Sequence, residues 1–583
     1  MARIAIVRKE KCKPESSGKF CIKACPVNRT GKECITMGTD NKVIIDESLC
    51  IGCNICVKCP IEAISIINLP EELKQKPIHR YGVNGFSLYS LPIPVFGKVV
   101  GILGVNGIGK STAIKILAGM LKPNLGEKGK AATHKELIEY FKGTEAQSFF
   151  EKVRDKNIKI SYKPQQVDLI PQTFKGTVKE LLKKVDEKNK LEETAQQLDI
   201  TPILNSKIES ISGGELQRVA IAATVLKKAD VYIFDEITSY LDIKQRLNVS
   251  RFIRVLADEN TSVMIIEHDL IALDYMTDLI HIMYGKEDCY GIVSLPRTTK
   301  NGINAYLEGF LKEDNIRFRN SKIEFEIKAK EKEKKRNPLT SWKSMEKKLG
   351  NFNLIAEPGE VSKGEAVGVL GENGIGKTTF VKLLAGVIKP DKGSPDTKVK
   401  VSYKPQYIDS TSNELVMNIM KDAIKKYDNE IIVPLTIKPL LTKQINQLSG
   451  GELQRVAIAL SLSKDCNLVL LDEPSAYLDV EQRLKVSKVI KHIIEQRNIS
   501  AIIVDHDLLF LDYLSDRLLV FEGTPAKHGL VKGPFSMEQG MNSLLTLLNL
   551  TLRRDGTSHR PRINKINSVK DREQKSAGKL YYS

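Results

Sequence analysis

The protein is a chain of 583 residues, of which 42% are hydrophobic and 27% are charged, as in an ordinary globular protein. This length predicts roughly three to five domains. The sequence has no apolar run near the roughly 20 residues that span a bilayer. Its start, Met1–Arg8, is too short and too charged for a signal peptide. The composition therefore excludes a membrane-spanning protein and predicts a cytoplasmic one.

The net charge is strongly positive, +18 from 89 Lys and Arg against 71 Asp and Glu. Such an excess favours a polyanionic partner, most commonly nucleic acid. A basic protein without such a partner has the same composition, so charge alone leaves both interpretations open.

Eight of the ten cysteines lie between residues 12 and 59. In a cytoplasmic chain such clustering indicates metal binding rather than disulfides. The first group is Cys12, Cys21, Cys25 and Cys34, and the second is Cys50, Cys53, Cys56 and Cys59. Proline follows Cys25 and Cys59. Apolar stretches at 43–45 and 63–67 are expected to form short strands around the site.

The two Cys-Pro groups resemble the bacterial two-cluster ferredoxin, whose run is C-x2-C-x2-C-x3-C-P. The resemblance implies an α+β ferredoxin-like domain at 1–75 with two 4Fe-4S clusters bound by the eight cysteines. A zinc ribbon is the alternative, because C-x2-C pairs also bind zinc. The chain departs from the pattern in two ways: the gap from Cys56 to Cys59 is two residues, and Ser17 stands where another cysteine is expected. Either Cys34 completes the count of eight ligands, or the second cluster is labile or absent.

A phosphate-binding loop follows an apolar strand at 99–103. Residues 104–111 match G-x-x-x-x-G-K-S/T, whose backbone amides wrap phosphate groups. The lysine reaches the β- and γ-phosphates, the serine holds Mg²⁺, and the following helix directs its N-terminus at the anion. The nucleotide-binding residues predicted here are Gly104, Asn106, Gly107, Gly109, Lys110, Ser111 and Thr112. Upstream, Tyr81 or Phe86 is a candidate for stacking on adenine, with a core aromatic as the equal alternative.

The catalytic groups are predicted downstream of this loop. Gln165 is expected to meet Mg²⁺ and the attacking water. Asp235 and Glu236 end the apolar stretch that begins at Val231, so Asp235 would anchor Mg²⁺ and Glu236 would act as general base. His268 is expected to contact the γ-phosphate.

The same pattern occurs twice, which indicates a duplicated domain. Ser212-Gly213-Gly214 recurs as Ser449-Gly450-Gly451, and the following Asp-Glu pair comes 23 residues after the serine in both copies. The second copy supplies Gly371, Asn373, Gly374, Gly376, Lys377, Thr378, Thr379, Gln406, Asp472, Glu473 and His506. By the same roles, Thr378 and Gln406 are expected to meet Mg²⁺ in the second copy. About 26 extra residues lie in the first copy only, where helical spacing predicts a surface helical hairpin at about 127–155, interpreted as a docking element or a neutral insertion.

Taken together, these motifs resemble the core of the ABC ATPases. That resemblance implies an α/β fold with two P-loop domains facing each other head to tail. It places each ATP between one domain's phosphate loop and the other's Ser-Gly-Gly, so that Lys110 pairs with Ser449 and Lys377 with Ser212. Asp242 and Asp479, in Ser-Tyr-Leu-Asp and Ala-Tyr-Leu-Asp, also belong to the family pattern. Ile237 replaces the proline usual after Asp-Glu.

The remaining segments connect or follow the two domains. We expect nucleotide-binding domains at 76–284 and 345–545, a hinge or linker at 285–344 and a basic tail at 546–583. The charge run 328–336 is typical of a solvated loop. The tail is either disordered or packed across the domain junction as a second hinge.

The combination of two Cys-Pro groups, two ABC domains and an insertion in the first domain resembles subfamily E of the ABC ATPases, the ribosome-recycling or RNase L inhibitor family. Further matching stretches are 79–82, 301–304 and 568–575. The resemblance implies ATP-driven splitting of ribosomes after termination or rescue, with a release factor or its rescue paralogue as partner. It also implies binding to the small subunit and its rRNA, by a monomer whose domains dimerise internally.

Three alternatives are kept beside this interpretation. In these alternatives, the chain would be the ATPase subunit of a membrane transporter, an ATP-dependent iron–sulfur redox protein, or a tandem ABC translation factor. The transporter interpretation gives the N-terminal cysteines no role, and the tandem translation factors lack clusters.

Overall fold

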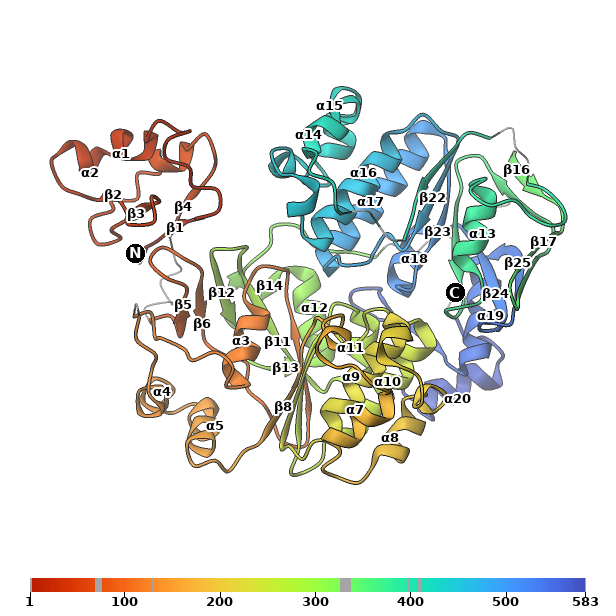
Figure 1. The fold of residues 1–583 in the computed structure, drawn as a ribbon, viewed down its shortest axis with the longest axis horizontal. Helices are drawn as coiled ribbons and strands as arrows, with labels where there is room; N and C mark the ends of the chain where they lie inside the picture. The colour runs from red at the N-terminus through yellow and green to blue at the C-terminus, as the bar shows by residue number, and fades with distance from the viewer. Residues whose placement is uncertain are drawn as a thin grey trace.

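The computed structural model describes residues 3–68, 76–127, 129–325, 337–395, 399–406, 408 and 410–581. It comprises a small cysteine-rich module and two α/β domains that face each other (Figure 1). Within the described residues, no helix has both the length and the apolar character needed to cross a bilayer.

The cysteine-rich module is built on two small antiparallel sheets. Strand β1 pairs with β4, and β2 pairs with β3. The expected strands at 43–45 and 63–67 are β3 and β4. The elements are β1 (Arg3–Val7), α1 (Phe20–Ala24), α2 (Pro26–Arg29), β2 (Ile35–Met37), β3 (Val43–Ile45) and β4 (Ile64–Asn68).

The first α/β domain is built on one sheet with the strand order β5-β6-β12-β11-β7-β10-β9-β8, and β13 pairs with β11 at its side. Strands β7, β10 and β9 are parallel and completely buried, which explains their continuous apolar sequences. The strands are β5 (His79–Arg80), β6 (Ser87–Tyr89), β7 (Val99–Leu103), β8 (Ile160–Lys163), β9 (Val231–Asp235), β10 (Ser262–Ile266), β11 (Leu279–Lys286), β12 (Tyr290–Val293) and β13 (Arg297–Thr298). The helices are α3 (Lys110–Leu117), α4 (His134–Tyr140), α5 (Glu145–Arg154), α6 (Ile170–Thr173), α7 (Val178–Val185), α8 (Leu191–Gln197), α9 (Gly213–Val225), α10 (Ile243–Leu256), α11 (Leu270–Met276) and α12 (Thr299–Glu308).

The second α/β domain repeats this sheet as β17-β18-β25-β24-β20-β23-β22-β21. Strand β20 takes the place of β7, β23 of β10 and β22 of β9. The strands are β16 (Pro338–Trp342), β17 (Met345–Leu349), β18 (Phe352–Ala356), β19 (Gly359–Ser362), β20 (Ala366–Leu370), β21 (Val401–Lys404), β22 (Leu468–Asp472), β23 (Ser500–Val504), β24 (Arg517–Thr524) and β25 (His528–Ser536). The helices are α13 (Lys377–Leu384), α14 (Val416–Ile419), α15 (Lys421–Tyr427), α16 (Gly450–Ser463), α17 (Val480–Arg497), α18 (Leu508–Leu514) and α19 (Met537–Leu548).

The insertion in the first domain forms the expected helical hairpin, α4 and α5. Thr133 begins α4 with a capping box to Glu136. The aromatic side chains Phe141, Phe149 and Phe150 are buried in the cluster that also contains residues of α3. The hairpin is therefore anchored by its apolar side to the first domain.

Residues 285–344, expected as a hinge or linker, contain several regular elements in the structure. Strands β12 and β13 join the first sheet through β11, and α12 follows them. The short strands β14 (Phe310–Leu311) and β15 (Ile316–Arg317) pair with each other, and β16 pairs with β19 of the second domain. The sequence pattern was obscured because these strands are only two to five residues long. The charge run at 328–336 lies outside the described residues.

The basic C-terminal segment is folded, in contrast to the disordered alternative. It contains β26 (Leu552–Arg554), β27 (Pro561–Ile563) and α20 (Val569–Ser576). Both Arg560 and Arg562 donate to Asp274 of α11 in the first domain, at 3.1 Å and 2.6 Å. Asn304 of α12 donates to Asp555 at 3.1 Å. The segment after the second domain thus packs back on the first.

Candidate functional site

The first phosphate loop joins β7 to α3, and α3 begins at Lys110, so that Thr112 lies in its first turn. Gly109 has a positive φ of 88°, and a Cβ there would lie 2.6 Å from the Phe86 ring, so only glycine fits. The Lys110 ammonium donates to the carbonyl oxygens of Gly104 and Val105 at 2.9 Å and 2.8 Å. Burial lowers the pKa of Lys110, and an anion in the loop would restore the charged form.

The catalytic acids follow β9. Glu236 has a φ of 49°, a left-handed conformation that is uncommon for a residue other than glycine, and Glu473 has the same angle. Such backbone strain clusters at functional sites. Gln165 donates to the Glu236 carboxylate at 2.7 Å. Burial, and then the charge of Asp235, raise the pKa of Glu236, which suits a group that accepts a proton from water.

A histidine stands beside each of these glutamates. The His268 Nε2 atom lies 3.8 Å from Glu236, and the His506 Nε2 atom lies 3.6 Å from Glu473. Burial lowers the pKa of both histidines well below the ordinary value. Both residues are 6% exposed, and their ring nitrogens have no hydrogen-bond partner among the described residues. A neutral, buried N–H needs an acceptor, which a γ-phosphate oxygen would supply.

The residues that would hold Mg²⁺ converge in both domains. Ser111 lies beside Asp235 and Thr378 beside Asp472, and in each case burial is the larger effect and raises the pKa of the aspartate. In the second domain Gln406 donates to Glu473 at 2.7 Å. Hydroxyl, amide and carboxylate oxygens are the donors that Mg²⁺ prefers, so these residues fit the ion.

Two pairs of positioning residues were missed by the sequence reasoning. Lys163 is fully buried and donates to the carbonyl oxygens of Asp235 and Glu236, both at 2.9 Å. Lys404 does the same for Asp472 and Glu473. Burial lowers the pKa of both lysines to about 8.

Gln217 and Gln454 also hold the backbone of the catalytic glutamates in place. Each donates at 2.6 Å to the carbonyl oxygen of its domain's catalytic glutamate. The signal for the lysines was present in the sequence, because Tyr-Lys-Pro-Gln occurs at both 162–165 and 403–406.

The two domains complete each other's phosphate loops. The backbone N–H of Asn106 donates to the Asp479 carboxylate at 3.1 Å, and the backbone N–H of Asn373 donates to the Asp242 carboxylate at 2.8 Å. The second oxygen of each aspartate caps its own helix, α17 or α10. Lys244 also pairs with Glu372 at 3.0 Å. The contacts are reciprocal, as expected for a head-to-tail arrangement.

A cavity of about 1360 Å³ runs between the domains. Its lining includes Ser212–Gly214 together with the Lys377 loop, and Ser449–Gly451 together with Asn106 and Gly107. The Ser-Gly-Gly motifs begin α9 and α16, where Ser212 and Ser449 form capping boxes. Two helix N-termini therefore point into the cavity, where they favour anions.

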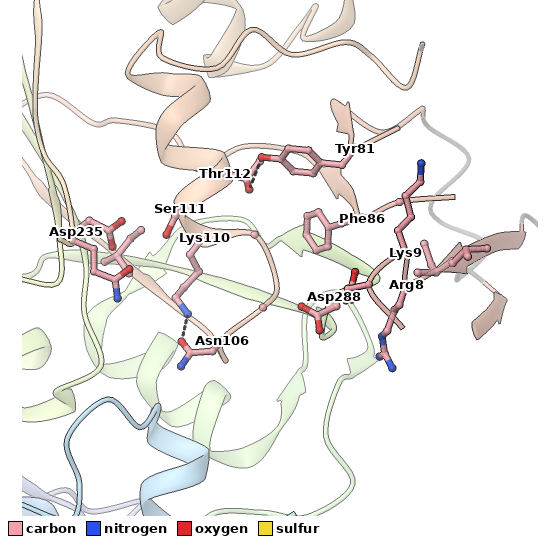
Figure 2. A pocket seen from close by; sticks show the side chains of 18 of the residues that line it. Arg8, Lys9, Tyr81, Phe86, Asn106, Lys110, Ser111, Thr112, Asp235 and Asp288 are labelled. Carbon is pink, nitrogen blue, oxygen red and sulfur yellow. Dashed lines mark hydrogen bonds between the residues drawn. The ribbon is translucent and has the colours of Figure 1, made fainter. Parts of the chain in front are cut away.

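The first site extends outward into a cavity of about 650 Å³. Phe86 packs against Gly109 as Phe352 packs against Gly376, so these two rings are counterparts. Tyr81 also lines the first site, with its hydroxyl 3.3 Å from that of Thr112. Figure 2 shows Arg8 and Lys9 on the far side of the cavity from Lys110, with Phe86 and Tyr81 between them. The N-terminal module therefore lines the first site, which no sequence motif indicated.

The module is fastened to the wall of this cavity. Asn84 exchanges two hydrogen bonds with the Ile45 backbone, at 2.9 Å and 3.0 Å, and its carbonyl accepts from Val7. Arg80 donates to Glu47 at 3.0 Å. Residues 79–86 thus contact the cysteine module on one side and the nucleotide cavity on the other.

The eight N-terminal cysteines form two sets. One small cavity is lined by Cys25, Cys34, Cys50, Cys53 and Cys56. In the other set, Cys21 neighbours Cys59 and Cys12, and burial together with these thiols raises its pKa to about 11. All eight are free of disulfides. Within the described residues, no three His, Cys, Asp or Glu side chains are spaced to hold a single metal ion.

Known proteins share this arrangement of two ATP-binding domains. The family model described as ABC transporter matches residues 95–239 and 358–476. Over 100% of its length the chain is 51% identical to an uncharacterized ABC transporter ATP-binding protein of Methanocaldococcus jannaschii, of which it covers 97%. It is also 46% identical, over 100% of its length, to ABC transporter E family member 1 of Arabidopsis thaliana, of which it covers 99%.

Two solved structures resemble this chain over most or all of its length. A structure of ribosome-bound archaeal Pelota and ABCE1 matches with a TM-score of 0.95 and 50% identity, over 100% of this chain and 99% of that chain. The archaeal ribosome recycling factor in complex with the archaeal ribosomal stalk protein matches with a TM-score of 0.83 and 50% identity, over 88% of this chain and 100% of that chain. The likeness thus spans the cysteine module as well as both ATP-binding domains.

Proposed function

Because the chain belongs to subfamily E of the ABC ATPases, the family of the ribosome recycling factor ABCE1, we propose that it splits ribosomes into subunits by using ATP. It acts after termination or rescue and remains on the small subunit. The observation that carries this proposal is the pair of amide–carboxylate contacts, Asn106 to Asp479 and Asn373 to Asp242. They make both ATP sites dependent on closure of a single chain.

Closure converts binding energy into movement. A ligand shifts an equilibrium by its differential affinity for the two states, and each nucleotide contacts both domains only in the closed one. The loop 79–86 ties the cysteine module to the first site. Rearrangement around the first nucleotide is thereby transmitted to the module, which wedges the subunits apart.

Hydrolysis resets the closed state. Lys110 and Lys377 bind the phosphates, while His268 and His506 donate to the transferred group. Glu236 and Glu473 accept the proton of the attacking water, which Gln165 and Gln406 help to orient. Mg²⁺ held by Ser111 and Thr378 would neutralise charge on the phosphates.

The cysteine sets fit two iron–sulfur clusters in a structural role. Thiolates are the ligands that such clusters select, and the thiols gather in two separate sets. Bound clusters would stiffen a module whose described strands and helices are no longer than five residues.

The partners proposed for this chain are the small ribosomal subunit with its rRNA, and a release factor or its rescue paralogue such as Pelota. The structure containing ribosome-bound Pelota and ABCE1, at 50% identity, supports this choice. The net charge of +18 suits a ribosomal surface. We propose that the protein acts in the cytoplasm as a monomer, since both composite sites form within one chain.

Sucrose-gradient sedimentation tests the splitting function. Ribosomes are mixed with this protein and a Pelota-type factor, with and without ATP. We expect the intact ribosome peak to be replaced by free subunits only with ATP, and the Glu236→Gln/Glu473→Gln variant to stay with the small subunit. An unchanged ribosome peak, with the clusters verified, would contradict the proposal and favour the transporter or redox interpretation.

A further inference from the structure

The two cysteine sets are unequal in size. Five thiols, those of Cys25, Cys34, Cys50, Cys53 and Cys56, line the first set's cavity. The second set consists of the other three N-terminal cysteines, Cys12, Cys21 and Cys59, and in it Cys12 and Cys59 neighbour Cys21. A cluster bound entirely by cysteine needs four, so one set has a thiol to spare and the other lacks one.

The chain order explains which ligand is missing. In a two-cluster ferredoxin pattern, three cysteines of a run bind one cluster and the fourth, before proline, binds the other. Cys25 lies with the second run's cysteines and Cys59 with the first run's, as that exchange requires. The first run must then supply three ligands besides Cys25. It supplies Cys12 and Cys21. Between these two cysteines, Ser17 is partly buried whereas its neighbours Ser16 and Gly18 are exposed, so Ser17 is the residue at the place of the missing ligand.

Cys34 does not fill the gap, in contrast to one of the sequence-based alternatives. It lines the first set's cavity together with Cys25 and Cys50. Its thiol donates to the Asp46 carbonyl at 3.7 Å. Cys34 therefore lies with the first set, where four other cysteines are already present.

We propose that the second set binds its cluster through only three thiolates, those of Cys12, Cys21 and Cys59, and that the fourth iron, on the side of Ser17, has no thiolate ligand. The inference rests on the proposed presence of clusters but not on ribosome splitting. The Ser17 hydroxyl donates to the Pro14 carbonyl at 3.2 Å, so it is engaged within its own turn.

An iron without thiolate is the one released when the cluster is oxidised. A one-electron oxidant such as ferricyanide takes one electron from a 4Fe-4S cluster of charge 2+. One Fe²⁺ then leaves, and a 3Fe-4S cluster of charge 1+ remains. The three thiolates keep their bonds throughout. The first set, with four thiolates, retains all its iron under the same treatment.

Electron paramagnetic resonance and iron release test this on the full chain, purified without oxygen and treated with about one equivalent of ferricyanide. We expect the signal of an oxidised 3Fe-4S cluster and release of about one iron per chain. Ser17→Cys should lower both at least ten-fold. Ser16→Cys, which places a thiol one residue away on an exposed position, should behave as the parent does.

Each other outcome overturns the proposal. Full retention of iron and no signal in the parent would mean that a fourth ligand is present. An undiminished signal in Ser17→Cys would place the open iron elsewhere, and loss of the signal in Cys34→Ala would make Cys34 a ligand of this cluster. About four irons per chain in both the parent and Ser17→Cys would mean that the second set holds no cluster. A failure of ribosome splitting alone would leave these readings unchanged.

Discussion

The two nucleotide sites are nearly the same where phosphate would bind and different where the base would lie. Lys110 and Lys377 donate to equivalent loop carbonyls, and Glu236 and Glu473 share the same φ and the same glutamine contact. At the outer end, Arg8 and Lys9 of the cysteine module line only the first site. Among the described residues that line the interdomain cavity, which contains the second phosphate loop, none comes from that module.

The two sites therefore share the residues for ATP hydrolysis but differ in their connection to the cysteine module. Duplicated phosphate contacts give both sites the means to hydrolyse ATP. Because the described residues of the cysteine module line only the first site, nucleotide binding there acts on the module directly, whereas binding at the second site does not. We therefore expect changes at the phosphates to act on both sites alike, and changes at the outer end to act on the first alone.

The largest expected effect comes from replacing both catalytic bases. Glu236→Gln with Glu473→Gln should lower steady-state ATP hydrolysis by about 10²- to 10⁴-fold, the range typical of a general base. Each single variant, measured against the exposed control Glu259→Gln, should lose the turnover of its own site. Parental turnover in the double variant would show that these residues are not the bases.

Replacing the interdomain aspartates should have the next largest effect. Each replacement should weaken ATP binding at the phosphate loop of the opposite domain. Asp479→Asn should weaken ATP binding at the first phosphate loop, and Asp242→Asn at the second. Asparagine retains an oxygen for the helix cap but has none left for the opposite amide. Loss of a charge-assisted bond of roughly 1.5–3 kcal/mol predicts about ten-fold weaker binding or more.

Fluorescent ATP-analogue titrations distinguish the two sites when one lysine is removed. Asp479→Asn is measured in a Lys377→Ala background and Asp242→Asn in a Lys110→Ala background. Weakening of the site in the aspartate's own domain would contradict the head-to-tail arrangement.

A smaller effect is expected for the residue from the cysteine module. Arg8→Ala should weaken nucleotide binding at the first site by a few-fold, because a half-exposed charge contributes about 0.2–1 kcal/mol. The same titration in the Lys377→Ala background measures it, with exposed Lys58→Ala as control. An equal loss in the Lys110→Ala background would show that the module does not distinguish the sites.

The smallest effect is on the pH profile. Burial raises the pKa of Glu236 and Glu473, so activity should fall on the acid side above pH 4.5, where an exposed glutamate would still be ionised. Gln165→Ala or Gln406→Ala removes a bond that favours the ionised form. Each should therefore move its site's acid limb to higher pH, while exposed Gln166→Ala should not. A shift to lower pH would reverse the assigned effect of the glutamine.

The sequence was informative where function depends on neighbouring residues in the chain. The phosphate loops, the Asp-Glu pairs and the helical hairpin each lie within one short stretch, so spacing and apolar pattern sufficed. The head-to-tail pairing was inferred by resemblance, and Asn106 and Asp479 lie 373 positions apart. No periodicity connects residues at such a distance.

Other features needed the structure because their partners come from separate elements. Arg8 reaches the first site only because β1 pairs with β4 and Asn84 fixes the module to the first domain. Lys163 resembles a surface lysine in sequence, yet it is buried under the acidic turn. The placement of Cys34 with Cys25 depended on how the loop before β2 folds.

The C-terminal segment changes how the two halves meet. Arg560 and Arg562 hold Asp274 of the first domain, so this contact holds the two halves of the chain together in addition to the chain itself. Such tethering gives each half an effective concentration of the order of millimolar with respect to the other. Closure is then a first-order event whose rate does not fall on dilution. A few copies of the protein among many ribosomes would close as readily as a concentrated solution.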